Sequence, residues 1–180
     1  MLQKYFIAII PPEPVFSQIE NIKKEVSEKY NNKSALRSPS HITLHMPFEW
    51  KTEKEEILLN TLSNFKTDFP AFEINLKNYN CFEPKVVFVD VVENENLNRL
   101  QKAVVKQVKS NLNIFNQADD MRKYHPHVTI AFRDLKKEFF YLMMEEYRNK
   151  SFEANFLCNS FFLLKHTGKS WLPYKEFKFA

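Results

Sequence analysis

The chain has 180 residues, of which 44% are hydrophobic, so it can build one domain with its own core. Its single glycine, Gly168, excludes Gly-rich phosphate loops and dinucleotide fingerprints, because both need several glycines at fixed spacing. The formal net charge of +4 suits an anionic substrate but is far below that of a protein that wraps nucleic acid.

The cysteines and the N-terminus indicate the compartment. Cys81 and Cys158 are too few for a disulfide framework or a Cys-rich zinc site. The short apolar run at the N-terminus is cut off by Pro11 and Pro12, so it reads as a first strand and not as a signal peptide. No stretch approaches the length of a membrane span. We therefore expect a reduced, cytoplasmic location and no membrane partner.

The chain opens with a strand, a helix and a second strand. Residues 3–10 are apolar and predict a buried strand. Apolar residues then recur at helical spacing and predict an amphipathic helix over about 13–30, with Pro14 in its first turn. A polar segment leads to a strand over about 40–46, which Pro47 is expected to end.

A second helix and a third strand complete the first half. Thr52 followed by Glu55 is typical of a capping box and predicts a helix start. Residues 71–82 alternate apolar and polar, as a half-exposed strand does. The expected buried stripe of the helix is Ile57, Leu58, Leu62 and Phe65.

The same order of elements follows in the second half. Residues 85–92 predict a strand, and apolar spacing from Glu95 predicts a helix to about 111. A loop rich in Asn, Gln and Asp leads to a strand over 125–132, and Asp134 is expected to cap a helix to about 149. The expected buried stripe of this helix is Phe139, Leu142, Met143 and Tyr147. The tail predicts strands near 151–157, 159–166 and 172–179.

A four-residue phrase occurs once in each half, inside a predicted strand. It reads His41-Ile42-Thr43-Leu44 in the first half and His127-Val128-Thr129-Ile130 in the second. Side chains alternate between the two faces of a strand, so the apolar pair of each phrase faces a core while His and Thr share the other face. The order strand, helix, strand, helix, strand fills about 3–82 and again about 85–157. Two such units about a pseudo-two-fold axis would bring both phrases together.

With these two phrases the chain resembles the 2H phosphoesterase superfamily, in its branch of 2′-5′ RNA ligase-like proteins and RNA 2′,3′-cyclic phosphodiesterases. The opening FIAIIPPE at 6–13 and the segment at 86–101 support the resemblance. It implies an α+β fold: a single bilobal domain over 1–180, with C-terminal strands at 159–179. Two antiparallel sheets would form a central cleft with the helices outside.

The resemblance implies a metal-independent enzyme that hydrolyses, or reversibly ligates, 2′,3′-cyclic or 2′-5′ phosphodiesters of RNA ends or small nucleotides. His41 and His127 would be the acid–base pair, and Thr43 and Thr129 would bind phosphate. Imidazole titrates near pH ~6.5, so one neutral and one protonated copy suit this chemistry, in either assignment. No cofactor is expected. A monomer is the default state, and the alternative is an RNA- or nucleotide-binding protein with little turnover.

Two other histidines raise a zinc alternative. Strand alternation predicts that His45 shares the face of His41, and that His125 shares the face of His127. Four imidazoles together would suit zinc, but neither strand offers a carboxylate or a cysteine, so no metal site is predicted.

Aromatic residues beside the motifs are candidates for stacking on substrate bases. They are Phe48, Tyr124, Phe132 and Trp171, although core packing explains any one of them better in a chain with 18 phenylalanines. Arg133 and Lys165 are candidates for holding phosphate, although a solvated charge explains each of them equally well.

Overall fold

The computed structural model describes residues 1–65, 69–116 and 124–179. The strands in these residues are β1 (Leu2–Ile9), β2 (Ile42–Lys51), β3 (Phe72–Phe82), β4 (Val86–Val91), β5 (His127–Ala131), β6 (Glu153–Cys158), β7 (Ser160–His166) and β8 (Trp171–Lys178). The α-helices are α1 (Val15–Tyr30), α2 (Glu55–Ser63), α3 (Glu95–Leu112) and α4 (Lys137–Tyr147), and short 3-10 turns occupy Ser34–Arg37 and Thr52–Lys54. The Asn-, Gln- and Asp-rich loop predicted before β5 lies largely outside the described residues.

The strands form one eight-stranded antiparallel sheet in the order β6-β3-β4-β5-β2-β1-β7-β8. We expected two separate sheets, but β2 and β5 pair at Ile42 and Val128 and so join the two four-stranded halves. The fold is α+β as predicted. The motif strands lie side by side at the centre of the sheet, which brings the two phrases together.

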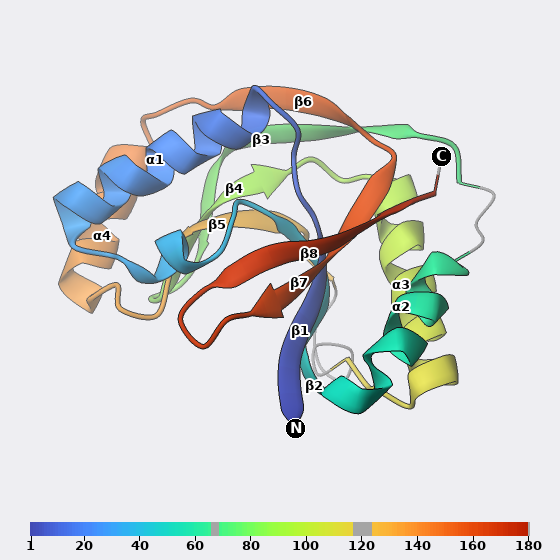
Figure 1. Ribbon diagram of the computed structural model, residues 1–180. Coiled ribbons are helices and arrows are strands. Elements are labelled where there is room, and N and C mark those ends of the chain that lie inside the picture. The colour runs from blue at the N-terminus through green and yellow to red at the C-terminus, as the bar shows by residue number, and fades with distance from the viewer. Residues whose placement is uncertain (66–68, 117–123, 180) are drawn as a thin grey trace.

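The helices cross over between the halves of the sheet. α1 follows the first strand but contacts β5, and α3 follows the fourth strand but contacts β2. Figure 1 shows α1 and α4 gathered at one end of the molecule and α2 and α3 at the other. The apolar residues Ile19 on α1 and Val104 on α3 are fully buried. Each motif strand is therefore packed on its core side by a helix from the other half of the chain.

None of the helices in the described part of the chain is long and apolar enough to cross a membrane.

Pro47 does not end the second strand, contrary to our prediction, because a β-bulge accommodates it. Tyr5 of β1 pairs with Phe48, and Ile7 pairs with His45, so Met46 and Pro47 together oppose one residue of β1. A residue in a bulge need not donate a ladder hydrogen bond, and proline has none to donate. The strand therefore continues to Lys51.

Both predicted helix caps are wrong, because their side chains have partners elsewhere. Thr52 begins a 3-10 turn, and its hydroxyl donates to the carbonyl of Met1 at 3.3 Å. Asp134 accepts hydrogen bonds from the backbone N–H groups of Lys33 (3.1 Å) and Ser34 (3.2 Å). The carboxylate of Asp134 thus caps the turn after α1, not α4.

The buried stripes of the two shorter helices match the expected ones only in part. On α2, Leu58 and Leu62 are buried but Ile57 is 51% exposed. On α4, Leu142 is 55% exposed. The buried side chains of α4 are Phe140, Met143, Met144 and Tyr147. Both helices carry apolar residues on more than one face, so the sequence pattern alone left their orientation open.

Candidate active site

The register of the two central strands sets the arrangement of the motif residues. Ile42 and Val128 are directly opposite each other in an antiparallel pair. One residue to either side, the same register places His41 opposite Thr129 and Thr43 opposite His127. Each histidine therefore lies beside the threonine of the other motif.

The motif histidines and threonines lie on the sheet face away from the main core. Ile42, Leu44, Val128 and Ile130 are at most 1% exposed and belong to that core. The alternate residues His41, Thr43, His127 and Thr129 are partly exposed, and we call the sheet face that carries these four residues the histidine face. The two imidazoles and two hydroxyls thus share one surface, as the motif pattern predicted.

Both motif histidines are oriented by the same kind of backbone contact. Nδ1 of His41 lies 2.6 Å from the carbonyl oxygen of Pro39, and Nδ1 of His127 lies 2.7 Å from that of His125. A carbonyl oxygen only accepts, so each Nδ1 carries the proton and donates it. In a neutral ring this leaves the lone pair on Nε2. Each histidine is therefore fixed in the tautomer that offers Nε2 for proton transfer.

Each motif histidine also packs on a buried phenylalanine of the adjacent strand. The ring centroids of His41 and Phe6 on β1 are 4.8 Å apart, and those of His127 and Phe88 on β4 are 4.7 Å apart. Phe6 is 3% exposed and Phe88 is fully buried. Apolar support of this kind restricts the ring rotation that the single Nδ1 contact leaves free.

Burial favours the neutral form of both imidazoles. It lowers the pKa of His41 from 6.5 to about 4, and the hydrogen bond to Pro39 opposes this shift only in part. The positive charge of Lys23 lowers the pKa of His41 further. Burial also lowers the pKa of His127, while the nearby carboxylate of Asp90 acts in the opposite direction. The free protein therefore holds both rings neutral at pH 7.

Comparison with known proteins decides the family. The family model described as the 2′-5′ RNA ligase superfamily matches residues 11–170, which include both motifs. The chain belongs to this superfamily of 2H phosphoesterases. A search of curated proteins found no match by sequence.

Solved structures of superfamily relatives share the fold over their full length. The structure of Escherichia coli LigT in apo form is 19% identical with a TM-score of 0.66, and the match covers 99% of this chain and 98% of LigT. TT0787 of Thermus thermophilus is 19% identical with a TM-score of 0.67, and the match covers 98% of this chain and 97% of TT0787. The structure of LigT complexed with 3′-AMP is 19% identical with a TM-score of 0.67, and the match covers 99% of this chain and 98% of LigT. At this identity the likeness establishes the fold.

A buried ionic network lies behind the first histidine of this superfamily member. Nζ of Lys23 is 2.7 Å from both Oε1 of Glu20 and the carbonyl oxygen of Ser38. The same Oε1 accepts hydrogen bonds from the backbone N–H of Ser40 at 2.8 Å and from its hydroxyl at 2.7 Å. The network holds residues 38–40, and with them the carbonyl of Pro39 that orients His41.

Sequence reasoning missed this network, although a signal was present. Lys23 lies in phase with the buried stripe of α1, which includes Ile19, Val26 and Tyr30, and it is 1% exposed. A lysine within an apolar helical stripe is rarely buried without a partner. Glu20, one turn earlier, is that partner.

A different network lies beside the second histidine. Asp90 pairs with His127 in the β4–β5 register. Its Oδ1 lies 3.0 Å from Nε2 of His125, and its Oδ2 accepts a hydrogen bond from the side-chain amide of Asn80 at 3.0 Å. The carboxylate thus positions His125, whose carbonyl in turn orients His127.

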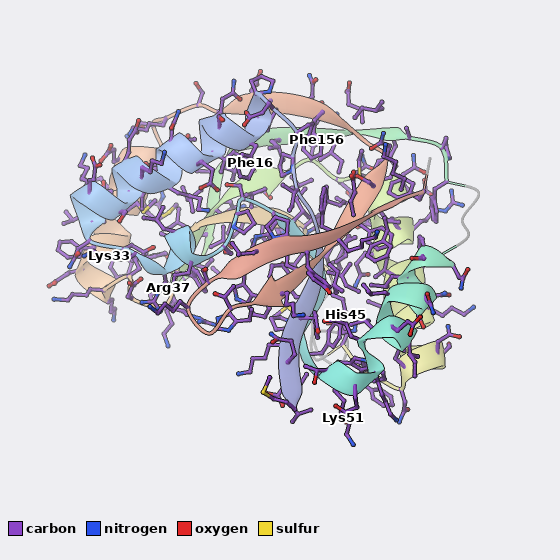
Figure 2. The ribbon with its side chains drawn as sticks, in the orientation of Figure 1. Phe16, Lys33, Arg37, His45, Lys51 and Phe156 are labelled. Carbon is purple, nitrogen blue, oxygen red and sulfur yellow. The ribbon has the colours of Figure 1, made fainter. Side chains whose placement is uncertain are left out.

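His45 lies on the opposite face from His41, contrary to the alternation argument. Thr43 pairs with Ala8 and His45 pairs with Ile7, so Leu44 forms a second bulge and the face changes. His45 is 1% exposed, and Figure 2 labels it between β1 and α2. The zinc alternative required His45 beside His125, and the bulge separates them. No group of three or more His, Cys, Asp or Glu side chains in the described residues could hold a metal ion.

Of the four candidate stacking residues, only Trp171 contacts a phenylalanine that packs on a motif histidine. Trp171 packs edge-to-face on Phe6, with centroids 4.8 Å apart. Phe48 is 8% exposed in the main core, and Tyr124 packs against that core while its hydroxyl donates to the carbonyl of Thr43 at 2.9 Å. Phe132 lies beyond the end of β5.

The candidate phosphate-binding cations have other contacts. The guanidinium of Arg133 lies 5.1 Å from the ring centroid of Phe132. Nζ of Lys165 is 2.6 Å from Oε1 of Glu55, on the core side of the sheet next to Tyr5. The described contacts join neither cation to a motif residue.

A cavity of about 590 Å³ lies at another place, between the start of β1 and the β7–β8 hairpin. It is lined by Leu2, Gln3, Lys4, Lys165, His166, Thr167, Gly168, Leu172, Pro173 and Tyr174. None of the four motif residues lines this cavity. The candidate active site is therefore defined by the geometry of the motif residues and not by the cavity.

Proposed function

We propose that this protein hydrolyses, or reversibly ligates, 2′,3′-cyclic or 2′-5′ phosphodiesters of RNA ends or small nucleotides by two-histidine acid–base catalysis. The observation that carries the proposal is the matched pair of Nδ1–carbonyl contacts, which leaves Nε2 of both His41 and His127 for proton transfer. LigT, which shares the fold, has been solved with 3′-AMP, with ATP and with NADP+. Those complexes support a nucleotide substrate.

Opening a cyclic phosphate needs both imidazoles in different proton states. One neutral Nε2 takes a proton from water as the water oxygen bonds to phosphorus. The other imidazole, protonated, gives its Nε2 proton to the ribose oxygen as the bond from that oxygen to phosphorus breaks. Both rings are neutral in the free protein, so the acid must gain its proton when substrate binds. A phosphate anion between the rings favours that charged form.

The threonine hydroxyls provide hydrogen bonds to the phosphate. Each lies beside the histidine of the other motif, so a phosphate between the imidazoles meets Thr43 and Thr129 from both sides. Donation to the non-bridging oxygens becomes stronger as negative charge builds up on them in the transition state. This division of roles needs no metal and no nucleotide cofactor.

The test uses an RNA oligonucleotide that ends in a 2′,3′-cyclic phosphate, with EDTA present. Wild type is expected to open the ring to one phosphomonoester. His41→Ala and His127→Ala are each expected to lower the rate by about 10² or more. Thermal unfolding of each variant checks that the fold is retained. If wild type binds the oligonucleotide but does not turn it over, the catalytic proposal is wrong and an RNA-binding protein is favoured.

We further propose that the protein is a monomer with one cooperative domain, located in a reduced cytoplasmic compartment. Cys81 and Cys158 are both free thiols, which fits that location. Light scattering after gel filtration is expected to give the mass of one chain, 21.6 kDa. Two separate unfolding transitions would contradict the single domain.

A further inference from the structure

Two groups of aromatic rings lie on the histidine face, one in each half of the sheet. In the first half the buried ring of Phe6 contacts both His41 and Trp171, with centroid distances of 4.8 Å to each. Trp171 begins β8 and is partly exposed. Phe6 belongs to a small cluster that is separate from the main core. An aromatic surface therefore adjoins His41.

The second half repeats this arrangement with different residues. The buried ring of Phe88 lies 4.7 Å from His127 and 4.6 Å from Phe82. Phe82 ends β3 and is 38% exposed. Its ring also meets His127 edge-to-face at 5.2 Å. An aromatic surface therefore adjoins His127 as well.

Each of the two aromatic groups also contains one further histidine ring. The imidazole of His166 lies 4.7 Å from Trp171, and that of His125 lies 5.5 Å from Phe82. Each group thus holds one buried phenylalanine, one motif histidine, one partly exposed aromatic and one additional histidine. The two groups flank the Ile42–Val128 pair, which joins the halves of the sheet.

We propose that Trp171 and Phe82 are two base-stacking platforms, one on each side of the reacting phosphate. The substrate class that fits them is a phosphodiester with a nucleoside on both sides, such as a 2′-5′-linked dinucleotide. A cyclic mononucleotide has one base and fills one platform only. Stacking on aromatic rings accepts every base, so the platforms provide affinity with little sequence preference. The inference rests on the proposed function, because it takes the phosphate to lie between the motifs.

The test measures binding of two ligands that cannot be cleaved through a cyclic phosphate. 3′-Deoxyadenylyl-(2′→5′)-adenosine has two bases but lacks the hydroxyl that would form a cyclic phosphate. 3′-Deoxyadenosine 2′-methylphosphate has the same diester and only one base. Titration calorimetry gives both affinities for wild type and for Phe82→Leu and Trp171→Leu. Phe115→Leu is the matched control, because Phe115 is 61% exposed on the loop after α3.

Wild type is expected to bind the two-base ligand at least about 5-fold tighter than the methyl ester. Phe82→Leu and Trp171→Leu should each weaken the two-base ligand by about 5- to 150-fold, and only one of them should weaken the methyl ester. Trp171→Phe should keep most of the affinity, since it retains a ring. The control variant should bind both ligands as wild type does.

Equal affinity of wild type for the two ligands, or an effect of only one platform variant on the two-base ligand, would overturn the two-platform proposal. Turnover of the cyclic-phosphate oligonucleotide would then still stand as evidence for the proposed function. Absence of binding of both ligands, together with absence of turnover, would overturn both proposals.

Discussion

Ile42 of β2 pairs with Val128 of β5, and this pair joins the two halves of the sheet. Both side chains are fully buried on the core side, which turns the neighbouring His41 and His127 to the opposite face. The pair also sets which threonine lies beside which histidine. One apolar contact between two distant segments thus assembles the candidate site.

The hydroxyls of the two motif threonines are expected to act on catalysis and not on stability. Thr43→Val and Thr129→Val should each lower kcat by about 10², because each removes one donor to the developing charge on the phosphate. Thr43→Ser and Thr129→Ser should retain most activity. Thr61→Val, a change on α2 away from the histidine face, is the control. Activity that is lost in the serine variants but kept in the valine variants would show that the methyl group matters and not the hydroxyl.

The buried network of Glu20, Lys23 and Ser40 is expected to position His41. Lys23→Met should lower the free energy of unfolding by up to about 3 kcal/mol, because it leaves the Glu20 carboxylate without its cation. Urea unfolding measures this change. Glu20→Gln combined with Lys23→Met should recover part of the loss, since neither charge then remains unpaired.

The positioning role has its own readout in the nitrogen chemical shifts of the imidazoles. In wild type, NMR is expected to show His41 and His127 protonated on Nδ1. Lys23→Met should alter the shifts of His41 and leave those of His127 unchanged, because only His41 depends on the Pro39 carbonyl that the network holds. Equal changes at both rings would mean a general loss of structure.

His41 is expected to make stability depend on pH between about 4 and 6.5. Its pKa is 6.5 in the unfolded chain and about 4 in the folded protein, so the unfolded state binds the extra proton in this window. Stability should therefore be complete above pH 6.5 and fall as the pH drops, by up to about 3 kcal/mol for this group. The charged groups that act on His41 are Lys23 and Glu20 of α1, and His127 of β5 is a titratable neighbour.

Urea unfolding at about pH 7 and at about pH 4.5 measures this dependence, because most of the pH window of His41 lies between these two values. His41→Gln removes the titrating group, so its stability should fall less than that of wild type between the two pH values. A parallel fall in both proteins would assign the pH dependence to other groups.

Asp134 is expected to stabilise the turn after α1 and not α4. Asp134→Ala should cost about 1–2 kcal/mol, the range of a lost cap, because the N–H groups of Lys33 and Ser34 lose their acceptor. Asp134→Asn should cost less. Hydrogen exchange should rise at residues 33–37, and faster exchange confined to α4 would contradict this assignment.

The sequence by itself determined the order of the elements, the motif strands and the family. Strand and helix periods are local, so the segments around His41 and His127 show their alternation without any partner. The sequence also determined that Ile42 and Val128 face a core. It did not determine that they face each other.

Tertiary structure alone decided the register, the bulges and the partners of the buried charges. A bulge depends on the strand opposite, so nothing within β2 shows that His45 turns away from Thr43. Lys23 is buried because residues 38–40 fold over α1 and supply a carbonyl and a serine. The rings of Phe82 and Trp171 come from strands at the outer parts of the sheet. Only long-range pairing brings Phe82 beside His127 and Trp171 onto Phe6, the ring that contacts His41, because side-chain contacts between distant segments follow from the packing of the whole chain.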